Sequence, residues 1–238
     1  YEITLSPKTT KGPYGWHVSA IVDWQETQTD VEALVWSDIV RDSMSHTIPA
    51  TYSAMLRTAW AYIGTGALFR LMKLRGGPMV AALYPIAMLI LQLLLALVLG
   101  GAVALVGALL SHWALGLLAG GATVWAVLLA FKRRDARILA YYLMHDYAYS
   151  AAARGANPSE LEARLAQFAT RVVAALRSDV DEVLLVGHSS GAHLAISLLA
   201  DIERSGAHQT GGPALSFLSL GQVVPMVSFL PNAHRLRR

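Results

Sequence analysis

The sequence predicts an α/β fold in which a small parallel β-sheet is interrupted by a two-helix transmembrane hairpin. Two observations lead to this expectation. Residues 158–204 combine a helical pattern, a short apolar strand, a glycine-framed turn and a second helix, and such αβα units build parallel sheets. Residues 76–131 contain no Asp, Glu, Lys or Arg, and this run exceeds twice the roughly 20 residues that one membrane span needs.

The composition limits the class of protein. Of the 238 residues, 55% are hydrophobic and 15% are charged, whereas ordinary soluble domains carry about 25% charged residues. The net charge is +3, but the basic residues cluster beside the apolar segments and at the C-terminus, so we expect no nucleic-acid partner. The chain contains no cysteine, which excludes disulfides and thiolate zinc sites.

Residues 1–75 are expected to form the N-terminal part of the domain that carries the sheet. Residues 1–5 and 16–24 alternate between apolar and polar positions, as in two strands that pair as a hairpin. Residues 25–30 are polar, and residues 31–40 fit either a strand or a short helix. Residues 51–75 predict a basic helix, which fits a bilayer surface next to a span or the core of the soluble part equally well.

Residues 76–131 have room for two spans, which we place at 79–99 and 108–130, with the turn between 100 and 112. Gly116, Gly120 and Gly121 are expected to let the two helices approach closely. Basic side chains flank both ends of the run, so both flanks are expected on the cytoplasmic side. We therefore expect an integral protein of a bacterial inner membrane, with the lipid bilayer as its partner.

Residues 132–238 are expected to form the core of the sheet domain. Residues 138–153 predict a helix, and the next helix is predicted to run to residue 178, with Asn157 as N-cap, Pro158 as first helical residue and Glu160 completing a capping box. Residues 183–186 predict a fully buried strand, and residues 215–221 predict a second one. The helix between these strands makes the pair a βαβ crossover, in which the strands are parallel.

Gly187, His188, Ser189, Ser190 and Gly191 form a G-x-S-x-G pattern between the predicted strand and helix. In this context the central serine occupies a strained turn, the flanking glycines allow close packing, and the N–H of Ser190 is the expected oxyanion donor. The alternative is an ordinary glycine-rich strand-to-helix turn. A nucleotide site is disfavoured, because the turn contains neither a P-loop lysine nor a G-x-G-x-x-G pattern.

The motif Gly-His-Ser-Ser-Gly, with its flanking Leu-Leu-Val and Ala-His-Leu-Ala, resembles the α/β-hydrolase superfamily and specifically its lipase- and esterase-like members. The resemblance covers residues 181–204. It implies a partial α/β-hydrolase-like parallel sheet and ester hydrolysis through an acyl-enzyme on Ser189, without a cofactor or metal. His188 is then a candidate substrate-binding residue. A hairpin beside the site favours a lipid or small lipophilic ester as substrate, and the oligomeric state stays undetermined.

The resemblance also implies an acid and then a histidine after the serine. The later acids, Asp201 and Glu203, lie on the predicted helix that follows Ser189 and are expected to be surface charges. His234 has the right chain order and is the candidate base. We expect a fragment that lacks the first strand and the last strands. The alternatives are a catalytically inactive scaffold protein and an acyltransferase that uses the same serine.

Overall fold

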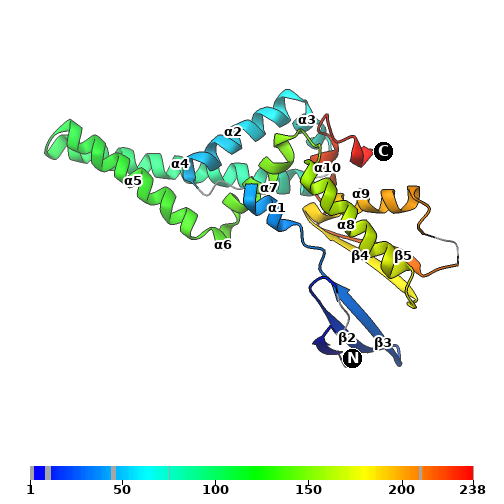
Figure 1. Ribbon diagram of the computed structural model, residues 1–238. Helices are drawn as coiled ribbons and strands as arrows, with labels where there is room; N and C mark the ends of the chain where they lie inside the picture. The colour runs from blue at the N-terminus through cyan, green and yellow to red at the C-terminus, as the bar shows by residue number, and fades with distance from the viewer. Residues whose placement is uncertain (1–2, 9–11, 44–46, 75, 209–210, 238) are drawn as a thin grey trace. The chain divides into compact units, whose positions relative to one another are not determined.

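The structure is a computed structural model that describes residues 3–8, 12–43, 47–74, 76–208 and 211–237. The described chain is mixed α/β and mostly helical, with one antiparallel sheet, one parallel sheet and a pair of long apolar helices (Figure 1). Its contacts divide it into two units, one ending at Arg41 and one beginning at Asp42. The expected division at residues 75 and 131 stays a prediction.

The first unit is an antiparallel sheet of β1 (Ile3–Pro7), β2 (Gly15–Val22) and β3 (Gln25–Glu32), in that order. The predicted pairing of the first two strands is confirmed, with Ile3 opposite Ala20. The third strand was not predicted, because its side chains are polar and mostly exposed. Asp23 and Trp24 form the loop before it with positive φ at both positions, as a two-residue hairpin turn of type I′ requires.

Two helices replace the single helix predicted for residues 51–75. After α1 (Ser37–Ser43), α2 (Ile48–Gly64) begins behind Thr47, whose hydroxyl caps the N–H of Ala50. The chain then turns at Gly66, which has a φ of 72°, before the short helix α3 (Ala67–Leu71). Glycine adopts this left-handed conformation without steric cost, so it stops the helix where the apolar periodicity predicts continuation.

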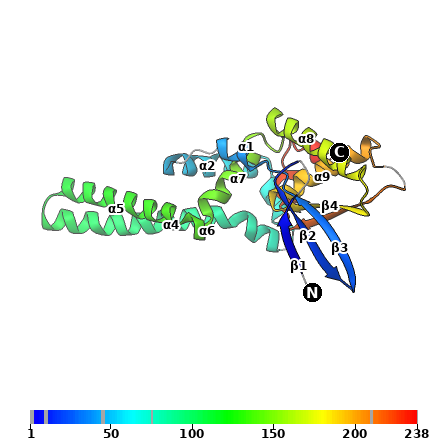
Figure 2. The ribbon, with the colours of Figure 1, turned by 60° about the horizontal axis from the view of Figure 1, so that its bottom comes forward.

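The helices α4 (Gly76–Leu110) and α5 (Trp113–Arg133) form an antiparallel pair whose members lie side by side in both views (Figures 1 and 2). The turn falls at Ser111 and His112, within the predicted interval, and the His112 ring accepts a hydrogen bond from Ala114 N. Segments 82–110 and 113–133 are long and apolar enough to cross a membrane, and most of their side chains are exposed.

Glycines hold this helix pair together. A Cβ atom on Gly116 would lie 2.4 Å from the oxygen of Ala104, and one on Gly120 would lie 2.6 Å from the oxygen of Gly100. Both expected close approaches are therefore confirmed. The same expectation for Gly121 is wrong, because a Cβ there would meet nothing within 4 Å. Gly121 faces away from the partner helix.

Behind the hairpin, α6 (Asp135–Ile138) leads into α7 (Ala140–Ala152), close to the predicted helix. The Asp135 carboxylate accepts hydrogen bonds from the N–H groups of Tyr141 and Tyr142, and the Tyr84 hydroxyl of α4 donates to Ile138 O. The helix α7 packs against α2 and α4 in the main apolar core. It is therefore fixed firmly to the base of the hairpin.

The helix α8 (Ser159–Leu176) begins one residue later than predicted. Its N-cap is Pro158, and the Asn157 side chain donates to Glu162 at 2.9 Å instead of capping the helix. The predicted capping box is therefore wrong. The Asn157 amide is used to bind the Glu162 side chain near the start of α8. The cap position is left to Pro158, whose side chain cannot accept a hydrogen bond.

The parallel sheet consists of β4 (Glu182–His188) and β5 (Ala214–Leu220), connected by α9 (Ser190–Arg204), which confirms the βαβ crossover. The helices α8 and α9 contact each other and cover one face of β4. On the other face Leu184 and Val186 are 51% and 49% exposed, so the prediction of a fully buried strand is wrong. The short helices α10 (Val224–Ser228) and η1 (Arg235–Arg237) complete the described chain.

Candidate active site

The turn between β4 and α9 holds Ser189 in a strained backbone conformation. Its dihedral angles are φ 51° and ψ −121°, those of the first central residue of a type II′ turn, where glycine is usual. A side chain in this region costs about 1–3 kcal/mol and persists only where the surrounding structure imposes it. The sharp bend predicted from the G-x-S-x-G pattern is therefore present.

Backbone hydrogen bonds fix the strained serine from both sides. Ser189 N donates to Leu220 O at the end of β5 over 2.9 Å, and Ala192 N donates to Ser189 O over 3.1 Å. The serine thus lies where the two parallel strands end together, with α9 starting directly behind it. In open α/β sheets this edge is where ligands bind.

The hydroxyl of Ser189 does not take part in the local structure of the helix. Serine is among the best N-cap residues, yet the structure records no capping hydrogen bond from this side chain to α9. The first backbone hydrogen bond recorded at the start of α9 is donated by Ala192 N, so the N–H groups of Ser190 and Gly191 precede it along the chain. The Ser189 hydroxyl, for which no hydrogen bond to another described residue is recorded, therefore lies next to backbone donors at the positive end of a helix dipole.

The two glycines of the motif have different roles. A Cβ on Gly187 would lie 2.7 Å from Ala192 Cα, which is backbone that cannot move aside. The predicted need for glycine at this position is confirmed. At Gly191 the prediction is wrong, because a Cβ there would meet nothing within 4 Å and its φ is not positive.

We expect Gly187→Ala to lower the free energy of unfolding by about 1–3 kcal/mol, the usual cost of forcing an extra carbon into close packing. Gly191→Ala is the matched control on the same turn and is expected to be neutral or slightly stabilising, since alanine favours helix by about 1 kcal/mol over glycine. Chemical unfolding of both variants checks the pair, and equal losses would contradict the assigned packing.

The residue after the nucleophile candidate contacts an acid that the sequence did not single out. Ser190 is buried, and its Oγ donates to Asp146 Oδ2 on α7 at 2.5 Å. Burial raises the pKa of Asp146, and the hydrogen bond from Ser190 opposes this rise. Burial and the nearby Asp146 charge also raise the pKa of Tyr147 to about 12. No spacing pattern connects residues 44 positions apart, so only the fold reveals this contact.

The histidines of the C-terminal part lie in different environments. His188 ends β4 and is exposed, next to Ser189. His193 is 6% exposed, and burial lowers its pKa to about 4, so it is neutral at pH 7. Its Nδ1 has no hydrogen-bond partner among the described residues.

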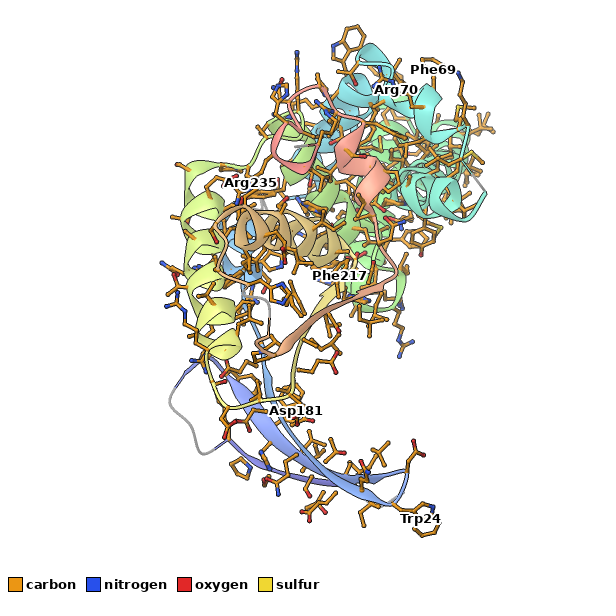
Figure 3. All side chains as sticks on the ribbon, turned by 90° about the vertical axis from the view of Figure 1, so that its right-hand side faces the viewer. Trp24, Phe69, Arg70, Asp181, Phe217 and Arg235 are labelled. Carbon is orange, nitrogen blue, oxygen red and sulfur yellow. The ribbon has the colours of Figure 1, made fainter. Side chains whose placement is uncertain are left out.

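Among the described residues, no recorded hydrogen bond or ion pair joins His234 to Ser189. His234 is exposed and precedes Arg235, which is labelled in Figure 3. The Arg235 guanidinium pairs with Glu162 on α8 and with Asp201 near the C-terminal end of α9. Asp201 is about three turns along α9 from Ser189. The role of His234 as a base stays a prediction that this contact does not favour.

The described residues contain no group of three or more His, Asp or Glu side chains arranged to hold a metal ion. Comparison with protein-family models, with curated proteins and with solved structures found no match for this chain. The resemblance to the α/β-hydrolase superfamily therefore depends on the motif and on the local geometry of its turn.

Proposed function

We propose that this chain belongs to a membrane-anchored serine hydrolase of the α/β-hydrolase type, which cleaves an acyl ester through an acyl-enzyme on Ser189. The observation that supports it best is the backbone of Ser189, a non-glycine residue held at φ 51° and ψ −121° between a parallel strand and a helix. Strained turns of this kind expose a nucleophilic hydroxyl above the sheet. An ordinary strand-to-helix turn gives no reason to keep a serine in a conformation that favours glycine.

In the proposed reaction the Ser189 hydroxyl attacks the ester carbonyl carbon and transfers its proton to a general base. The carbonyl oxygen becomes an oxyanion, which the N–H of Ser190 stabilises at the start of α9. The alcohol then leaves with a proton, and water hydrolyses the acyl-serine. No described residue is assigned as the base. His234 has the expected chain order, but the residue after it, Arg235, pairs with Asp201 near the far end of α9.

We propose further that α4 and α5 insert into a bilayer as a hairpin. At 1.5 Å per residue the 21 residues of α5 span about 31 Å, close to the roughly 30 Å of a hydrocarbon core. Basic residues flank the pair, with Arg70 and Lys73 before it and Lys132 and Arg133 after it. Both flanks are then cytoplasmic, because positive residues stay on that side.

A lipid or lipophilic ester is the proposed substrate class. The helix α7 packs against α4 of the hairpin, and its Asp146 contacts Ser190 beside the candidate nucleophile. One helix therefore connects the base of the hairpin with the reactive turn. An ester that partitions into the bilayer would reach such a site at a high local concentration.

A fluorophosphonate probe tests the function, because it reacts with serines that are activated for acyl transfer. We expect the full-length protein in lipid nanodiscs to be labelled, and we expect Ser189→Ala to lose labelling while keeping its helical circular dichroism. A folded wild-type protein that the probe does not label would contradict the proposal and favour a non-catalytic scaffold. Transfer of the acyl group to an added alcohol in preference to water would assign an acyltransferase instead.

A further inference from the structure

We propose that Asp146 is a positioning residue of the reactive turn, which holds the Ser190 hydroxyl and thereby orients the Ser190 N–H toward the oxyanion. This inference rests on the proposed function of Ser189. It adds to that site a residue from α7 that lies outside the G-x-S-x-G motif. It also gives the second serine of the motif a role for its side chain as well as for its backbone.

The contact lies at the place where the oxyanion donor is set. Ser190 is the first residue of α9, is 7% exposed, and donates from Oγ to Asp146 Oδ2. Hydrogen bonds to carboxylates are about twice as strong as those between neutral groups. Because the Oγ and the N–H belong to the same residue, fixing the side chain restricts the rotation of its peptide group.

The acid itself is held by a rigid support. Met144 and Tyr147, on either side of it along α7, are buried in the main apolar core. Tyr62 of α2 lies near Asp146, because the charge of this carboxylate adds to the effect of burial in raising the pKa of Tyr62. The Tyr62 hydroxyl donates to Met226 O at 2.9 Å. The carboxylate therefore has a fixed position from which it can restrain the first turn of α9.

A purely structural role explains this acid poorly. The structure pairs the Asp146 carboxylate with no Lys or Arg among the described residues, and its recorded partner is the neutral Ser190 hydroxyl. Asp146 is partly buried, and withdrawing a carboxylate from water without a cation beside it destabilises the folded state. Groups kept at such a cost are concentrated at functional sites. An apolar pair of similar size would fill the same space without that penalty.

Loss of the contact should affect the transition state more than substrate binding. Removing one oxyanion donor entirely lowers kcat by about 10²–10³-fold. Here the donor stays but loses its restraint, so we expect Asp146→Ala and Ser190→Ala each to lower kcat about 10-fold, with KM within about 2-fold. The double variant should be no slower than either single variant, because both remove the same hydrogen bond.

The test measures hydrolysis of a soluble p-nitrophenyl ester and the rate of fluorophosphonate labelling, with the full chain in nanodiscs. Asp146→Asn keeps an acceptor oxygen and should retain most of the wild-type rate. Ser197→Ala is the matched control for Ser190→Ala, since Ser197 lies on the same helix, is 3% exposed and donates to His193 O within that helix. We expect this control to react at the wild-type rate.

Asp146→Ala reacting as fast as wild type, or single effects that add up in the double variant, would overturn the inference while the function of Ser189 stands. A wild-type protein that does not react would remove the proposed function itself. In that case, amide hydrogen exchange at residues 190–192 shows whether the hydrogen bond between Ser190 and Asp146 restrains the first turn of α9. Faster exchange in Asp146→Ala, but not in Ser197→Ala, supports the restraint, and unchanged exchange overturns it.

Discussion

Ser189→Gly is expected to abolish probe labelling and ester hydrolysis and, at the same time, to make the protein more stable. The backbone angles of Ser189, φ 51° and ψ −121°, strain any residue with a Cβ atom but not glycine. The strain costs about 1–3 kcal/mol, and part of its release is offset by the greater chain entropy of unfolded glycine, about 0.5–1 kcal/mol. We expect a net gain of about 1 kcal/mol in the free energy of unfolding.

Ser189→Ala separates the two effects, because alanine lacks the hydroxyl but keeps the Cβ atom. This variant should be as inactive as the glycine variant and no more stable than wild type. Chemical unfolding and probe labelling of the three proteins check the prediction. Equal stability of the glycine and alanine variants would show that the turn does not strain residue 189. It would contradict the claim that the surrounding structure holds a catalytic serine in an unfavourable conformation.

Lysines placed on the exposed face of the hairpin should release the protein from membranes. Val98 on α4 and Leu118 on α5 are 68% and 72% exposed, and both fall within the apolar segments. A lysine near the centre of a span costs about 2.5–3.5 kcal/mol, which applies to Val98→Lys in the middle of segment 82–110. Leu118 lies nearer the end of segment 113–133, so Leu118→Lys adds a smaller loss of insertion free energy to the double variant. Extraction of isolated membranes with alkaline carbonate measures the outcome.

Leu184→Lys serves as the control, because Leu184 is also an exposed leucine but lies on β4, outside both apolar segments. We expect wild type and this control to stay with the membrane pellet, and the double variant to appear in the supernatant or in aggregates. Wild-type protein released by carbonate, or a double variant retained like wild type, would contradict insertion of the hairpin.

The features predicted correctly from sequence depend on neighbours along the chain. The bend at Ser189 follows from glycines and apolar runs within a few residues, and the helix pair follows from the uncharged run at 76–131. The same dependence on neighbours explains two errors. The local pattern favoured a helix that continues past Gly66, and it favoured a polar loop where the strand Gln25–Glu32 forms. In both places the tertiary structure overrides the local preference.

Features that depend on distant contacts were predicted only in part. Gly187 and Gly191 look equivalent in the motif, but only Gly187 faces the backbone of α9. In the same way Gly120 faces the partner helix, whereas Gly121 on the next position does not. The contact between Asp146 and Ser190 joins two helices that no sequence pattern relates. Such roles are set by what packs against a residue, which its own sequence context does not contain.

Mapping the covalent adduct tests the central claim most directly. After reaction of the folded, full-length protein in nanodiscs with a fluorophosphonate, peptide mass spectrometry identifies the modified side chain. We predict one adduct, on Ser189, that does not form after heat denaturation. Modification of Ser190 in place of Ser189, labelling that persists in the denatured protein, or a folded protein without any adduct would contradict the assignment of a nucleophile to this turn.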